Sequence, residues 1–134
     1  MFRIINYAIA ALIVAMPASA ESVSFLLCEY DGMGDGQRWK VQTIPLYYER
    51  DELIAIGRRN HCVDEPQYLL NENYAGWRCV TALNDDQTPA KSIYVEIHRF
   101  TGRYHRNDFS GHYSDMLIDD VWHGVCTPHH EAQF

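Results

Sequence analysis

The sequence has few basic residues and, beyond residue 20, no long apolar run. It carries 11 Lys and Arg against 18 Asp and Glu, for a net charge of −7 at pH 7. The nearest approach to a basic cluster, Arg99, Arg103 and Arg106, is interspersed with aromatic residues and His, whereas a protein that binds the phosphate backbone gathers Lys and Arg on one face. A membrane-spanning helix needs about 20 apolar residues. We therefore expect no nucleic-acid partner, and no membrane association for the chain after residue 20.

Signatures of catalysis are missing from the sequence as well. It contains neither a G-x-S-x-G nucleophile motif nor a C-x-x-C redox pair. The acidic pairs Asp85-Asp86 and Asp119-Asp120 are adjacent residues, whose side chains point to opposite faces of a strand and so form no cleft dyad. We expect a protein that is not an enzyme and needs no cofactor.

The N-terminal residues predict export. Arg3 precedes the nearly uncharged apolar run 4–16, and Pro17-Ala18-Ser19-Ala20 ends that run with small residues. A charged start, an apolar core and a small-x-small ending are typical of a secretory signal peptide, here residues 1–20, cut before Glu21. An uncleaved anchor is the alternative, but the apolar run is too short to span a bilayer. We expect residues 21–134 to form one periplasmic or secreted domain.

All four cysteines, Cys28, Cys62, Cys79 and Cys126, lie after the predicted signal peptide. An even number of Cys in an exported domain predicts disulfides, and the absence of C-x2-C spacing argues against zinc. Spacing alone does not select among the three possible pairings. We favour Cys62–Cys79, which flank a segment able to fold back, and Cys28–Cys126, which lie in the first and last strand-like runs.

Alternating apolar and polar residues predict several short strands. The strand-like runs are 22–30, 39–44, 77–83, 92–98 and 121–126. In the clearest hairpin, 92–98 turns at Thr101-Gly102 and returns through Arg103. With little helical periodicity, the sequence predicts a mainly β fold, a small antiparallel barrel or sandwich stapled by two disulfides, with one short helix left as an option.

The segment after residue 44 allows two interpretations. Pro45 cannot donate to a sheet ladder, so we expect it to end the preceding strand or to mark an edge. Residues 46–56 fit either a hairpin turning at Arg50-Asp51 or a helix with Pro45 in its first turn. We favour the hairpin.

The C-terminal part of the chain carries a sequence signature. Ile97-His98-Arg99-Phe100-Thr101-Gly102, followed by Gly124-Val125-Cys126, reads I-x-R-x-T-G … G-x-C. Together with Cys28, this ending resembles that of small exported proteobacterial proteins of uncharacterised function. The resemblance implies an exported, mostly β domain and transfers no catalytic residue. The plan of a small disulfide-closed barrel is also similar to periplasmic lysozyme inhibitors, although no inhibitor motif can be placed here.

Aromatic residues beside Arg and His suggest an exposed binding face, because such rings are typical interface anchors. The predicted interaction surface comprises Tyr94, Arg99, Arg103, Tyr104, Phe109 and Tyr113. We therefore expect a binding module whose partner is a protein or a glycan.

Seven histidines offer an alternative function, the binding of a divalent metal. Neutral imidazoles with Asp108 or Asp115 would suit zinc, copper or nickel. The candidate ligands are His98, His105, His112 and His123. No H-x-H or H-x-x-x-H spacing supports a preformed site, and histidines on outward strand faces are usually solvated.

Overall fold

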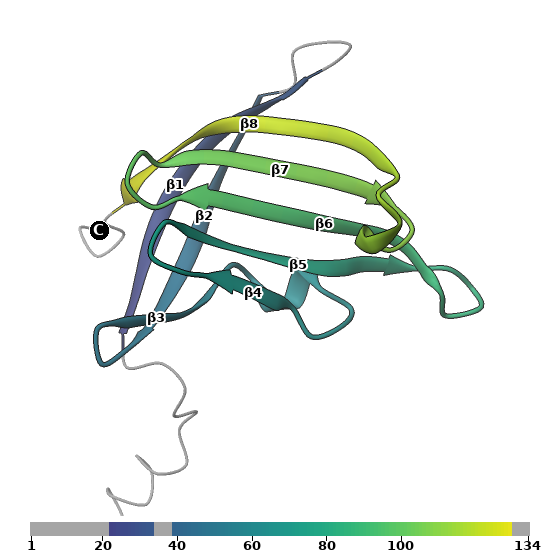
Figure 1. Ribbon diagram of the computed structural model, residues 1–134, viewed down its shortest axis with the longest axis horizontal. Helices are drawn as coiled ribbons and strands as arrows, with labels where there is room; N and C mark the ends of the chain where they lie inside the picture. Colours follow the sequence, from purple (N-terminus) through teal and green to yellow (C-terminus); the bar gives the residue numbers. More distant parts are fainter. Residues whose placement is uncertain (1–21, 34–38, 130–134) are drawn as a thin grey trace, which may run out of the picture.

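The computed structural model describes residues 22–33 and 39–129 and is built almost entirely of antiparallel strands (Figure 1). The strands are β1 (Ser22–Met33), β2 (Trp39–Glu49), β3 (Glu52–Ile56), β4 (Gln67–Leu70), β5 (Tyr74–Leu83), β6 (Pro89–His98), β7 (Arg103–Ser110) and β8 (Ile118–His129). Two single-turn 3₁₀ helices, η1 (Arg59–His61) and η2 (Tyr113–Asp115), lie in the connections. The predicted signal peptide, residues 1–20, lies outside the described residues.

One sheet contains all eight strands in the order β3-β2-β1-β8-β7-β6-β5-β4. Strands β1 and β8 pair in the middle of this order, and the sheet curls until its two edge strands, β3 and β4, come close together, which makes a nearly closed barrel (Figure 1). This confirms the predicted mainly β fold and selects the barrel over the sandwich. No helix among the described residues is long and apolar enough to cross a membrane.

Both predicted disulfides are confirmed. Cys28 and Cys126 are direct partners in the β1–β8 pairing, and their bridge joins residues 98 positions apart. Cys62–Cys79 ties the β3–β4 connection to β5. Next to it, Asp64 Oδ1 accepts a hydrogen bond from the Val80 amide at 2.9 Å, so the long connection is pinned against the sheet.

The segment around Pro45 forms the favoured hairpin, but Pro45 does not end its strand. Arg50 and Asp51 take positive φ values of 53° and 64°, which suits a two-residue turn whose twist matches the strands. Strand β2 runs through Pro45, and the prediction of a strand end there was wrong. The Pro45 carbonyl accepts a hydrogen bond from the Gly57 amide at 3.0 Å. Since the N and C=O of one residue face the same neighbouring strand, the N–H that Pro45 lacks would have faced the end of β3. The hydrogen bonds between β2 and β1 are therefore unaffected by Pro45.

The middle of the barrel is filled by aromatic rings. Tyr30 stacks on Tyr104 with ring centroids 4.4 Å apart, and Trp122 meets Tyr30 edge-on at 5.7 Å. The buried core comprises Cys28, Tyr30, Ile44, Leu46, Leu53, Ile56, Ala75, Trp77, Cys79, Val95, Ile97, Tyr104, Trp122 and Cys126. These rings are part of one continuous core that fills the interior of the barrel.

Candidate functional site

The mouth of the barrel holds a pocket of about 580 Å³. It lies where β1 begins, β8 ends and the β2–β3 and β6–β7 turns meet. Buried or half-buried apolar side chains form its floor: Leu26, Leu46, Leu53, Ala75, Ile97 and Cys126. Pockets of about 300–1,000 Å³ with apolar linings are typical of small-molecule sites, and barrel mouths are a common place for them.

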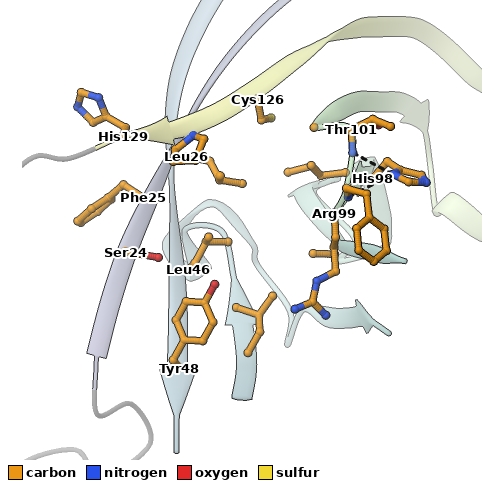
Figure 2. Close-up of a pocket in the computed structure, with 16 residues that line it drawn as sticks. Ser24, Phe25, Leu26, Leu46, Tyr48, His98, Arg99, Thr101, Cys126 and His129 are labelled. Atoms are coloured by element: carbon orange, nitrogen blue, oxygen red, sulfur yellow. Dashed lines mark hydrogen bonds between the residues drawn. The ribbon is translucent and has the colours of Figure 1, made fainter. Parts of the chain in front are cut away.

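The two walls of the pocket come from different elements. Leu46 and Tyr48 of β2 stand on one side, and Arg99 of the β6–β7 turn stands on the other (Figure 2). Phe25 and His129 are turned outward at the edge (Figure 2). A ligand in the mouth would therefore meet apolar and phenolic surface on one side and a guanidinium on the other.

The turn that carries Arg99 is held in place by hydrogen bonds. The Arg99 guanidinium donates to the Asn71 carbonyl at 2.6 Å, and its backbone amide donates to the Asn73 carbonyl at 2.8 Å. The His98 Nδ1 atom accepts from the amides of Phe100 and Thr101, each at 3.3 Å. Arg99 is thus a positioned cation rather than a freely moving one.

The charge of the mouth differs from that of the chain as a whole. The sequence carries a net charge of −7. Among the described residues that line the pocket there is no Asp or Glu, whereas Arg99, His98 and His129 are present. Phe100 beside them is 77% exposed, which leaves a large apolar ring at the rim. The described lining of the mouth thus combines an apolar floor with one formal positive charge, that of Arg99, and no negative charge.

Below the aromatic rings, the lumen contains a charged network. Asp108 accepts from Arg106 Nε at 2.7 Å and from Trp122 Nε1 at 2.9 Å. Burial alone would lower the pKa of Arg106, but the hydrogen bond and the charge of Asp108 outweigh it and raise that pKa. A smaller pocket of about 270 Å³ opens beside Arg106 and Gln42. Arg106 already pairs with Asp108, and Gln42 accepts a hydrogen bond from Tyr30 at 2.9 Å. We therefore interpret this network as structural support for the barrel.

The predicted interaction surface is not a continuous exposed face. Tyr104, Phe109 and Tyr113 are only 2%, 3% and 9% exposed, so their assignment to that surface was wrong. Tyr104 points into the lumen, and a register shift between Asp108 and Phe109 accompanies the burial of Phe109. Tyr113 sits in η2, which folds back with the Arg78 guanidinium 4.9 Å above its ring.

The remaining members of that predicted surface are separated. Tyr94 is half-buried on β6, whereas Arg99 and Arg103 are exposed at the β6–β7 turn. Burial, mainly, raises the pKa of Tyr94, with the charge of Glu96 adding to the effect. Of the predicted residues, Arg99 alone lines the mouth.

The four candidate metal ligands do not form one cluster. His98 accepts hydrogen bonds within its own turn, and His112 accepts from the Ser114 amide at 3.1 Å at the start of η2. His105 and His123 do meet, with their Nδ1 atoms 3.4 Å apart. The predicted carboxylate partner Asp108 is occupied by Arg106 inside the barrel. Among the described residues no group of three or more His, Cys, Asp and Glu side chains could hold a metal.

Sequence reasoning missed the pocket, although the strand pattern contained a signal for it. Ser24, Leu26 and Cys28 alternate along β1 and share one face. Because Cys28 lies in a core disulfide, the residues two and four positions before it had to continue that inner face towards the barrel end. Which end opens, and what stands opposite, depends on the path of the β6–β7 turn and is not visible in the strand pattern.

Comparison with known proteins returns no match, whether family models, curated proteins or solved structures are searched. The resemblance to small exported proteobacterial proteins therefore stays a prediction. In this structure the two halves of the I-x-R-x-T-G … G-x-C signature are in contact. The Gly102 carbonyl accepts from the Cys126 amide at 2.7 Å, and a Cβ on Gly102 would lie 2.3 Å from the Cys126 carbonyl oxygen. The signature thus marks a tight joint beside the β1–β8 disulfide.

Proposed function

We propose that the protein is an exported, non-enzymatic binding module that takes a small amphipathic ligand into the mouth of its barrel. The observation that carries the proposal is the pocket of about 580 Å³ whose apolar floor faces the positioned Arg99. The two disulfides support an oxidising compartment, periplasmic or extracellular.

The lining specifies the chemistry of the ligand. Leu26, Leu46 and Ile97 favour an aliphatic or aromatic body, since burial of apolar surface contributes roughly 25 cal/mol per Å². Arg99 has five N–H donors, of which one is used by Asn71, so donors remain for a carboxylate. We therefore propose an amphipathic carboxylate, such as a medium-chain fatty acid, as the class of ligand, in place of the protein or glycan expected from the sequence.

A fluorescence displacement assay tests this proposal. The probe is anilinonaphthalene sulfonate, and the competitors are dodecanoate and dodecanol, which share a chain but differ in charge. Dodecanoate should displace the probe better than dodecanol, and Arg99→Gln should weaken dodecanoate by about tenfold or more while leaving dodecanol unchanged, because a hydrogen bond to a charged group contributes about 1.5–3 kcal/mol.

Two further variants complete the design. Ser24→Trp places a bulky ring at the exposed wall of the mouth and should block the probe and both competitors. Arg103→Gln is the matched control, since Arg103 is exposed on the same turn but does not line the pocket. Probe binding that is undetectable in the wild type, or that survives Ser24→Trp, would overturn the proposal.

A further inference from the structure

We infer that His105 and His123 form a two-histidine site for a divalent transition-metal ion, zinc in the first place, on the outer face of β7 and β8. The two residues are direct partners in the β7–β8 register. Their neighbours Tyr104 and Trp122 are buried in the lumen, so strand alternation places both imidazoles outside. Neither His105 nor His123 lines the barrel mouth, and the site does not depend on the function proposed for the mouth.

The spacing of the two nitrogens fits a shared ion. Zinc binds imidazole nitrogen at about 2.0–2.1 Å with tetrahedral geometry, so two ligand nitrogens lie about 3.3–3.4 Å apart. The Nδ1 atoms of His105 and His123 are 3.4 Å apart, whereas a direct hydrogen bond from a nitrogen donor is usually about 2.7–3.2 Å long. The pair therefore already has the spacing of two tetrahedral ligands.

The same spacing discriminates between metals. Neighbouring ligands in a square-planar site are about 2.9 Å apart when each bond is about 2.0–2.1 Å, so Cu²⁺ would require the two rings to move closer together. Mg²⁺ and Ca²⁺ prefer oxygen ligands. Zinc is thus the ion that the pair accommodates with the least movement.

Carboxylates flank the histidine pair on both sides. Glu96 is the register partner of His105 on β6, and Asp31 is the partner of His123 on β1. The four residues thus form one row across four adjacent strands. Arg103, two residues from His105 along β7, opposes this negative charge. Two acidic groups beside the pair favour a dication and can accept hydrogen bonds from the water molecules bound to it.

The site has room for water to complete the coordination of the ion. A surface pocket of about 310 Å³ is lined by Glu96, His105 and His123, together with His98, Arg103 and Tyr74. Because no larger ligand cluster exists among the described residues, two coordination positions would be left to water.

Calorimetric titration with zinc chloride tests the inference on the chain prepared without a polyhistidine tag. The expected result is saturable binding of one zinc ion per chain at micromolar concentration. His105→Ala and His123→Ala should each weaken it by at least about tenfold, since both nitrogens hold the same ion, and Glu96→Gln should weaken it less. Cobalt(II) should give the intense visible absorption of a tetrahedral site, which both His variants lose.

His61→Ala and His112→Ala are the matched controls, because both residues lie away from the pair, in η1 and at the start of η2. Circular dichroism verifies that every variant is folded. The inference is overturned if the wild type shows no saturable binding at micromolar zinc, if binding persists in both His105→Ala and His123→Ala, or if only one of these two variants weakens it.

Discussion

Tyr30 and Tyr104 stack face to face across Gly124, with their ring centroids 4.4 Å apart. Gly124 is the register partner of Tyr30 on one side and of Tyr104 on the other. A Cβ at this position would lie 2.5 Å from the Tyr30 Cβ and 2.0 Å from the Glu29 carbonyl oxygen. The absence of a side chain on the central strand therefore allows the two rings to meet inside the barrel.

Replacing Gly124 by Ala should destabilise the protein by about 1–3 kcal/mol, because an added methyl group in a filled interior forces strands or rings apart. Urea unfolding with the disulfides intact measures the change. Val125→Ala, at the exposed neighbouring position, should change stability by less than about 0.5 kcal/mol. A Gly124→Ala variant as stable as the wild type would show that the tyrosine stack adjusts without cost.

The phenol of Tyr104 should make stability sensitive to alkaline pH. Burial, above all, raises its pKa far above the ordinary value, and its Oη is buried without a hydrogen-bond partner among the described residues. In the unfolded chain the phenol ionises near pH 10. Above that pH the unfolded state has lost a proton that the folded state keeps, so the free energy of unfolding falls as pH rises.

The Tyr104→Phe variant isolates that effect. Tyr68 and Tyr94 also have raised pKa values, but they are present in both proteins, so the difference between wild type and variant reports Tyr104. At neutral pH the variant should be at least as stable as the wild type, because it removes an unpaired buried hydroxyl. Urea unfolding from about pH 8 to about pH 11 should show a shallower decline for the variant; parallel curves would contradict this account.

The strands could be predicted from sequence because their alternation is local. The turn at Arg50-Asp51 and the hairpin at Thr101-Gly102 followed from residue types, and both disulfides followed once the first and last strands were placed. The continuation of β2 through Pro45 could not be predicted in the same way, since it depends on which neighbouring strand the missing N–H would face.

The candidate sites were harder to predict because both faces of β7 carry mixed residues. The strand alternates Arg103, His105 and Asn107 with Tyr104, Arg106 and Asp108, so charge does not mark the outer face. The side chains of Arg106 and Asp108 lie in the lumen together with that of Tyr104. This is the opposite of the expectation that Tyr104 is exposed. To predict the His105–His123 pair one must know the β7–β8 register. To predict the mouth one must know the position of the β6–β7 turn.

The two disulfides should contribute unequally to stability. In the chain-entropy model a bridge restricts the unfolded chain more when it closes a longer loop, by about 4–5 kcal/mol for roughly 100 residues and about 3 kcal/mol for roughly 15. The bridges here span 98 and 17 positions. The double variant Cys28→Ala/Cys126→Ala should therefore lose more stability than Cys62→Ala/Cys79→Ala in urea unfolding, and the reverse order would show that the β3–β4 connection limits the stability of the barrel.

Removal of Asp108 should cost more stability than removal of an exposed ion-pair partner. Asp108 neutralises Arg106 and accepts the hydrogen bond of Trp122 Nε1, so Asp108→Ala removes both the countercharge of a partly buried cation and one buried hydrogen-bond acceptor. Loss of a buried hydrogen-bond partner costs about 1–3 kcal/mol, and residual water access to the pair reduces the charge penalty. We expect a total loss of about 2–4 kcal/mol.

Glu65→Ala is the matched control for Asp108→Ala, because Glu65 pairs with Arg59 in full exposure and should contribute at most about 1 kcal/mol. Asp108→Asn separates the two roles: its amide oxygen can still accept from Trp122, while Arg106 loses its countercharge. An intermediate loss for Asp108→Asn would assign part of the effect to each partner. If Asp108→Ala were no more destabilising than Glu65→Ala, the lumen would have to be wet enough to solvate Arg106, through the pocket of about 270 Å³ beside it.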